Sequence, residues 1–173
     1  MLVLEGPNGS GKTSTLRMLA GLLPQAEGAI RFQRAGGEEV TDGEERGKFV
    51  AWLGHQDGIK AQLSVLENAS FFAALFAQQY VSETLDRVGL SHAADLPAAY
   101  LSAGQRRRLA LTRLLLSKRP LWLLDEPTAA LDAEGRALVT GLVGDHCAAG
   151  GIAIVSSHEK LALASVNIVL VAP

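Results

Sequence analysis

A glycine-rich segment between an apolar stretch and a helical pattern constrains the fold of this chain most. Residues 1–4 are apolar and lead into Gly6-Pro-Asn-Gly-Ser-Gly-Lys-Thr13, which fits GxxxxGK[ST] at every fixed position. Residues 12–20 then carry apolar side chains at helical spacing and stop before Gly21. A strand, a tight loop and a helix in this order predict a phosphate-binding loop, because glycines let successive N–H groups point at phosphate oxygens.

Individual residues of this loop have expected roles in binding a nucleotide. We expect Lys12 to reach the β and γ phosphates and the Thr13 hydroxyl to ligate Mg²⁺. The candidate nucleotide-binding residues are Gly6, Pro7, Asn8, Gly9, Ser10, Gly11, Lys12, Thr13 and Ser14.

Two acidic residues follow a buried strand pattern at Leu121-Trp-Leu-Leu-Asp-Glu126. Four consecutive apolar residues indicate a strand covered on both faces, as in a parallel sheet. Such a strand places Asp125 at the carboxyl edge of the sheet, where open α/β sheets bind ligands and a carboxylate can hold Mg²⁺ through water. Glu126 is then placed to act as the general base that polarises an attacking water.

Alternating strand and helix patterns along the chain predict a doubly wound α/β fold with a mostly parallel sheet. We expect a β-hairpin at 27–40 and then an acidic loop through Glu45. One helical segment is expected at 65–88, with Phe71, Phe72, Leu75 and Phe76 on its apolar face. Further strands are expected at 49–54, 121–124, 152–155 and 166–171, and further helices at 106–117, at 133–149 and, as a short one, between the last two strands.

Composition narrows the classes of partner. The chain has 173 residues, which favours one domain, and its net charge of −2 gives no electrostatic reason to bind nucleic acid. Its apolar runs are shorter than the roughly 18 residues that a membrane span requires, so we expect no direct membrane insertion. Cys147 is the only cysteine, which favours a reducing compartment.

The segment Leu101-Ser-Ala-Gly-Gln105, just before the helix at 106–117, resembles the signature of the ABC ATPase family. That signature usually reads LSGGQ, and this chain has the small residue Ala103 at the third position. Other family landmarks follow in order: Gln56 matches the Q-loop glutamine, Asp132 the D-loop aspartate and His158 the switch histidine. The signature residues are Leu101, Ser102, Ala103, Gly104 and Gln105.

The resemblance implies a P-loop NTPase with a RecA-like core at about 1–56 and 104–173 and a helical signature subdomain at about 57–103. It implies ATP and Mg²⁺ as cofactors, with Thr13, Gln56 and Asp125 at the metal and with Lys12, Gln56, Glu126 and His158 in catalysis. It implies a head-to-tail homodimer in which each signature faces the other chain's phosphate loop. Integral-membrane transporter subunits would hold this dimer at the cytoplasmic face of the inner membrane of a bacterium.

A narrower resemblance rests on residues 54–60, on Leu66-Glu-Asn68 and on the run 101–132. These segments are similar to the ATP-binding subunits of cytochrome c biogenesis haem exporters, in which a proline commonly stands at the position of Asp57. The family also carries an antiparallel layer with an adenine-stacking aromatic before the phosphate loop. Because this sequence begins in the phosphate-loop strand, we expect no adenine platform within it.

Three other functions stay open at the level of the sequence. A small-molecule kinase shares the phosphate loop but has no use for residues 101–105 or 130–132. A truncated module that binds nucleotide without turnover, and an ABC ATPase that serves another substrate, also fit. A rise of specific activity with protein concentration distinguishes a composite dimer site from a kinase.

Overall fold

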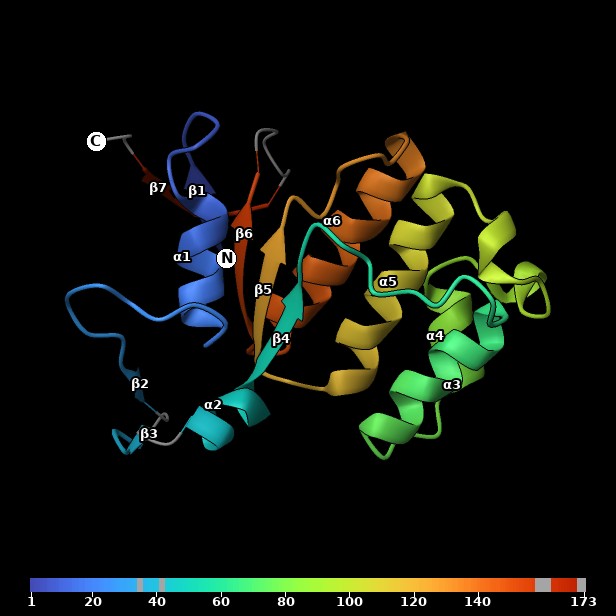
Figure 1. Ribbon diagram of the computed structural model, residues 1–173, viewed down its shortest axis with the longest axis horizontal. Coiled ribbons are helices and arrows are strands. Elements are labelled where there is room, and N and C mark those ends of the chain that lie inside the picture. The colour runs from blue at the N-terminus through green and yellow to red at the C-terminus, as the bar shows by residue number, and fades with distance from the viewer. Residues whose placement is uncertain (34–35, 41–42, 158–162, 171–173) are drawn as a thin grey trace.

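Five parallel strands form the central sheet of the computed structural model, which describes residues 1–33, 36–40, 43–157 and 163–170 (Figure 1). The strand order is β4-β5-β6-β1-β7, and β2 pairs with β3 in a separate antiparallel hairpin. This order confirms the predicted α/β fold with a mostly parallel sheet. The strands are β1 (Leu2–Glu5), β2 (Phe32–Gln33), β3 (Glu39–Val40), β4 (Val50–Leu53), β5 (Leu121–Asp125), β6 (Ile152–Ser156) and β7 (Val166–Val169).

Helices cover both faces of the sheet and extend beyond the β4 edge (Figure 1). The α-helices are α1 (Lys12–Leu19), α2 (Gly43–Phe49), α3 (Val65–Leu75), α4 (Val81–Arg87), α5 (Ala103–Ser117) and α6 (Ala133–Ala148). Two short 3₁₀ turns, η1 (Ser91–Ala93) and η2 (Ala98–Tyr100), precede α5.

Alternate side chains of β5 enter two different parts of the core. Leu123 packs with Leu16 of α1 on one face. Trp122 and Leu124 pack on the opposite face with residues of α5 and α6, such as Leu109. Because both faces are covered, the strand needs an unbroken apolar run, and this is the pattern that the sequence carries at 121–124.

Helices α3 and α4 pack against α5 to form the part of the molecule beyond β4. Helix α3 begins at a capping box, in which the Ser64 hydroxyl accepts a hydrogen bond from the Glu67 N–H and the Glu67 carboxylate accepts one from the Ser64 N–H. Asn68, which is buried, bonds through its side chain to Lys60, Leu63 and Ser64. These bonds fix the loop that leads from β4 into α3.

The single helical segment predicted at 65–88 is wrong, because the structure breaks it into α3 and α4. Ala77 has a φ of 52°, in the left-handed region that ends a helix, and the Gln78 N–H donates to the Ala73 carbonyl. The turn lets both helices reach α5, so that Phe76 and Val81 pack around Phe72. The apolar spacing of the two helices hides this break.

The acidic loop predicted through Glu45 is also wrong, because residues 43–49 form α2. Arg46 connects this short helix to the hairpin: its Nε donates to the Val40 carbonyl at 3.4 Å, and its guanidinium lies 5.7 Å from the centre of the Phe32 ring. These tertiary contacts outweigh the poor helix propensity of a segment with two glycines. The predicted hairpin itself is confirmed, with short strands.

Several predicted boundaries shift by a few residues. Helix α5 begins at Ala103 and not at residue 106, because Ser102 caps it. Strand β7 ends at Val169, and part of the short helix expected before it lies outside the described residues.

No helix in the described part of the chain is long and apolar enough to cross a membrane. Cys147 lies half-buried on α6 against the core.

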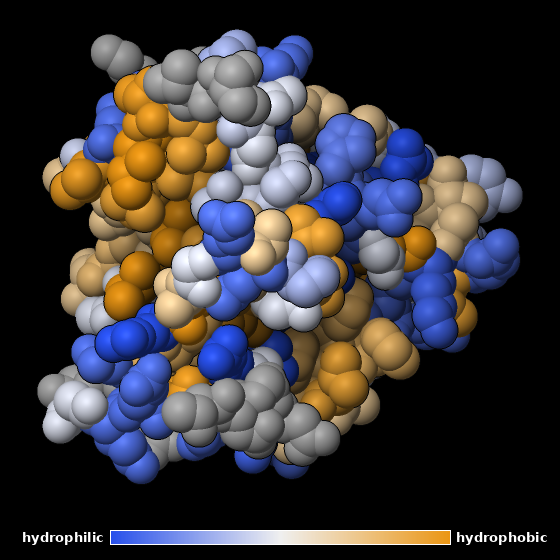
Figure 2. Space-filling view, turned by 60° about the vertical axis from the view of Figure 1, so that its left-hand side comes forward, coloured by the Kyte–Doolittle hydropathy of each residue, from blue (hydrophilic) through white to orange (hydrophobic). Residues whose placement is uncertain are grey.

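Strand β7 is an edge strand whose four residues are all exposed. Figure 2 shows apolar side chains gathered on this side of the molecule. The large apolar side chains that β7 exposes are Val166, Ile168 and Val169.

His146 fastens the end of α6 to the sheet. Its ring stacks on Trp122 with centroids 3.9 Å apart, and its Nε2 lies 3.1 Å from the Pro120 carbonyl and 3.3 Å from the Ile152 carbonyl. Burial lowers the pKa of His146 below 6.5, and the two carbonyl contacts offset this only in part. The folded protein therefore favours the neutral imidazole.

We expect the free energy of unfolding to fall as the pH drops below 6.5, because the unfolded chain then binds a proton at His146 more readily than the folded chain does. Substitution His146→Gln should flatten this dependence, and urea unfolding between about pH 5 and pH 8 measures it. Equal slopes in the two proteins would contradict the assignment to His146.

Candidate functional site

The phosphate loop, residues 6–13, joins β1 to α1 and has the backbone that its glycines predict. Gly6, Gly9 and Gly11 have φ values of 149°, 82° and 94°, which side-chain-bearing residues rarely adopt. The buried Lys12 donates through Nζ to the carbonyls of Gly6 at 2.8 Å and Pro7 at 3.0 Å. The ammonium group is therefore fixed inside the curve of the loop.

The beginning of α1 offers hydrogen-bond donors without a side-chain cap. Gly11 is the N-cap in a left-handed conformation, and within the described residues no side chain caps the first N–H groups of the helix. The Ser10 hydroxyl is buried and has no hydrogen-bond partner among the described residues. Uncapped N–H groups, an ammonium and a buried orphan hydroxyl suit an anion such as a phosphate.

Asp125, at the end of β5, accepts hydrogen bonds from two hydroxyl groups. Thr13 Oγ1 lies 3.0 Å from each carboxylate oxygen, and Ser156 Oγ donates to Oδ1 at 2.6 Å. Asp125 is only 4% exposed, so its charge depends on these partners. Thr13 and Asp125, one hydroxyl and one carboxylate, are the hard oxygen ligands that Mg²⁺ prefers, and they fit that ion.

Glu126 has a strained backbone that both of its neighbouring peptide groups hold in place. Its φ is 47°, which is costly for a residue with a side chain. Its N–H donates to the carbonyl and hydroxyl of Ser156, each at 3.1 Å. Glu126 lines a hollow of about 180 Å³ together with Arg136 and Ser157. Because Ser156 ends β6, the pairing of β5 with β6 sets the position of the Glu126 backbone from which the carboxylate projects.

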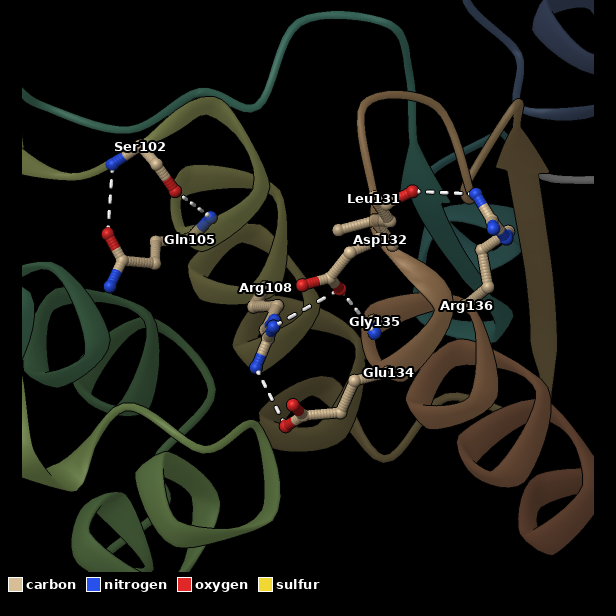
Figure 3. A network of polar contacts seen from close by, with 8 residues as sticks. All are labelled: Ser102, Gln105, Arg108, Leu131, Asp132, Glu134, Gly135 and Arg136. Atoms are coloured by element: carbon tan, nitrogen blue, oxygen red, sulfur yellow. Dashed lines mark hydrogen bonds and ion pairs between the residues drawn. The ribbon is translucent and has the colours of Figure 1, made fainter.

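The signature segment, residues 101–105, forms the start of α5 (Figure 3). The Ser102 hydroxyl accepts a hydrogen bond from the Gln105 N–H at 3.1 Å, and the Gln105 side chain accepts one from the Ser102 N–H at 2.9 Å. Leu101 is buried, whereas Ser102 and Ala103 are exposed. A methyl group on Gly104 would lie 3.3 Å from the Ala130 carbonyl, so a small residue suits this position.

Asp132 caps α6 and lies beside an arginine of α5 (Figure 3). Its Oδ1 accepts a hydrogen bond from the Gly135 N–H at 2.8 Å and lies 3.5 Å from Arg108 Nη2. Arg108 Nη1 also lies 3.5 Å from the Glu134 carboxylate. These contacts connect the signature helix to the segment at 130–132.

The structure brings together only part of the predicted site. Thr13, Asp125 and Glu126 meet at the carboxyl ends of β5 and β6, whereas Gln56 is exposed and makes no hydrogen bond within the described residues. The start of α5 and the phosphate loop lie toward the same end of the sheet but on opposite sides of it (Figure 1). His158 lies outside the described residues.

Sequence reasoning missed two residues of the site. Ser156 bonds to Asp125, and a serine that ends an apolar strand next to the acidic strand was the available signal. Arg107 is 4% exposed and bonds to Gly54, Asp57 and residues 125–127. It stands in the run of three arginines after the signature, which gives no hint that the middle one is buried.

Comparison with known proteins identifies the class. The family model described as ABC transporter matches residues 1–129, so the chain belongs to the ABC transporter family, whose ATPases bind ATP. A solved structure, a putative ABC transporter ATP-binding protein from Pyrococcus furiosus, superposes with a TM-score of 0.78 at 24% identity. The superposed region covers 98% of this chain and 83% of the Pyrococcus furiosus chain, and the two share the same fold.

More similar proteins carry a more particular name. The cytochrome c biogenesis ATP-binding export protein CcmA of Rhodopseudomonas palustris (strain BisB5) is 49% identical over 166 residues, which are 95% of this chain and 80% of that protein. The protein of the same name from Bradyrhizobium diazoefficiens is 51% identical with the same coverage. Within the ABC family, the chain thus groups with these bacterial export proteins.

Substitution Lys12→Ala should weaken ATP binding by roughly 10- to 100-fold, because a charge-assisted bond contributes about 1.5–3 kcal/mol. Titration calorimetry with ATP measures this loss. Lys48→Ala, which removes an exposed lysine of α2, is the control and should bind normally. Equal affinities in the two variants would refute the role of Lys12.

Substitution Ser156→Ala should lower the free energy of unfolding by about 1–3 kcal/mol, since it removes a buried donor to the Asp125 carboxylate. Urea unfolding measures the change. Ser165→Ala removes an exposed hydroxyl that bonds to Asn167 and should change stability little. If Ser156→Ala unfolds with the same free energy as wild type, the Asp125 carboxylate does not depend on the Ser156 hydroxyl.

Proposed function

We propose that the chain is the ATP-binding and ATP-hydrolysing subunit of an ABC transporter that exports haem for cytochrome c maturation. The observation that carries this proposal is the cluster of Thr13, Asp125, Ser156 and Glu126 beside the phosphate loop. The names of the relatives, which are export proteins of cytochrome c biogenesis, support the export role, and haem as the substrate rests on the family resemblance.

Residues of the phosphate loop and residues at the ends of β5 and β6 would have different roles in hydrolysis. Lys12 and the N–H groups of residues 6 and 8–14 would bind the phosphates, with Thr13, Asp125 and Gln56 as the residues that would hold Mg²⁺. When bound there, the metal would neutralise phosphate charge. Glu126 would accept a proton from water while the water oxygen bonds to the γ phosphorus and the bond to ADP breaks. By family resemblance, His158 would contact the γ phosphate.

Two copies would share each nucleotide. The signature segment lies across the sheet from the phosphate loop of its own chain (Figure 1), which favours action on the phosphate loop of a second copy. Ser102 and the N–H groups at the start of α5 would face the γ phosphate there. Asp132, connected to the same helix through Arg108, would lie at the interface of this homodimer.

Two parts of the chain would have different roles in this arrangement. We propose a RecA-like core at about 1–56 and 104–173 that holds nucleotide, and a helical subdomain at about 57–103. The exposed Gln56 lies where the first part of the core meets this subdomain. It would relay the state of the nucleotide to integral-membrane transporter subunits at the cytoplasmic face of the inner membrane.

Substitution Glu126→Gln should lower the ATP turnover number by about 10²- to 10⁴-fold, because the amide cannot accept the proton from water. The variant should still bind ATP and accumulate as a dimer, which light scattering after gel filtration detects. Glu83→Gln, on an exposed position of α4, is the matched control. Unchanged turnover in Glu126→Gln would reject Glu126 as the base.

The composite site has its own test. Specific ATPase activity of the wild type should rise with protein concentration until the dimer saturates. A constant specific activity together with phosphate transfer to a small molecule would support a kinase in place of a transporter subunit.

A further inference from the structure

Arg107 is a buried guanidinium whose every nitrogen is bonded. It is only 4% exposed, and it lies one turn into α5. Nε donates to the Pro127 carbonyl at 3.4 Å. Nη1 donates to the Gly54 carbonyl at 2.8 Å and to Asp57 Oδ1 at 2.9 Å, and Nη2 donates to the carbonyls of Asp125 at 2.9 Å and Glu126 at 3.0 Å.

These acceptors belong to two segments that the sheet no longer holds together. Strands β4 and β5 pair from Val50↔Leu121 to Leu53↔Leu124, and the pairing ends there. Gly54 and Asp125 are the next residues of the two strands, and Arg107 bonds to the carbonyl of each. The guanidinium thus connects β4 to β5 beyond the last paired residues of the two strands.

The same side chain fixes one side of Glu126. Glu126 has a left-handed backbone that persists only if its surroundings hold it. Ser156 accepts a hydrogen bond from the Glu126 N–H, and Arg107 donates one to the Glu126 carbonyl. Without Arg107, the Glu126 carbonyl would keep the hydrogen bond from the Ala129 N–H at 3.1 Å but lose its charged donor, and the direction of the Glu126 side chain would relax.

Asp57 supplies the charge that a buried arginine requires. The Arg107 and Asp57 side chains are 5% and 25% exposed, so their ion pair is partly shielded from water. A lysine could not replace the arginine, since an ammonium lacks the planar fork that reaches acceptors on two segments at once. The pair therefore couples the position of residues 54–57 to that of Glu126.

We propose that Arg107, with Asp57 as its counter-ion, is a positioning residue that connects the loop carrying exposed Gln56 to the proposed base Glu126. This inference rests on the proposed function. A contact that moves residues 54–57 would shift Gly54 and Asp57, and through Arg107 it would shift the peptide group of Glu126. Movement of that loop by a partner subunit would thereby change the rate of the hydrolytic step.

Kinetics of Arg107→Lys against Arg119→Lys test this coupling. Arg119 donates to the Val50 carbonyl at the opposite end of β4, so its variant removes the same kind of bond far from Glu126. In Arg107→Lys we expect the kcat for ATP to fall at least about tenfold, with KM and the Kd for ATP within about twofold of wild type, because Lys12 and Thr13 do not contact Arg107. Arg119→Lys should keep its kcat.

Hydrogen exchange supplies a readout that does not require turnover. Amides of residues 54–58 and 125–127 should exchange faster in Arg107→Lys than in wild type, whereas other segments and Arg119→Lys should be unchanged. A wild type that does not hydrolyse ATP would overturn the proposed function, and the exchange data would still decide the connection between the two segments.

A milder variant covers the case in which Arg107→Lys does not fold. Asp57→Asn keeps an acceptor oxygen for Nη1 but removes the charge, and its position is partly exposed. We expect a two- to fivefold loss of kcat with faster exchange at both segments. Wild-type kcat and exchange in Asp57→Asn, or exchange that rises uniformly along Arg107→Lys, would overturn the positioning role.

Discussion

The burial of the Asp125 carboxylate between two hydroxyl groups is the interaction on which the rest of the site depends. A buried charge is stable only with hydrogen-bond partners, and here Thr13 and Ser156 provide them from α1 and β6. Three segments that are distant in the sequence must therefore meet at one point. Because parallel strands end at the same edge of a sheet, the order β5-β6-β1 makes this meeting possible.

Arginines of α5 extend this arrangement outward from the sheet. Arg107 bonds to the ends of β4 and β5, while its neighbour Arg108 contacts Asp132 and Glu134 at the start of α6. One helix thus carries the signature segment at its start and contacts the ends of β4 and β5 and the start of α6.

Much of the fold was predictable because local patterns repeat at fixed periods. The strand-loop-helix at residues 1–20 and the buried strand before Asp125 appear in the structure as expected. The break at Ala77 was not predictable from period, since the apolar spacing continues across it. Helix α2 was missed because its stability comes from contacts of Arg46 with the hairpin and not from its own residues.

The sequence by itself determined the chemistry that is available: a phosphate loop with Lys12 and Thr13, two consecutive carboxylates after a buried strand, and a signature-like segment just before a helical pattern. These features depend on neighbours in the chain, so spacing alone encodes them. Only the tertiary structure decided that Ser156 holds Asp125 and that Arg107, of three consecutive arginines, is the buried one. Such contacts join residues far apart in the chain, and which side chains meet depends on how the helices pack on the sheet.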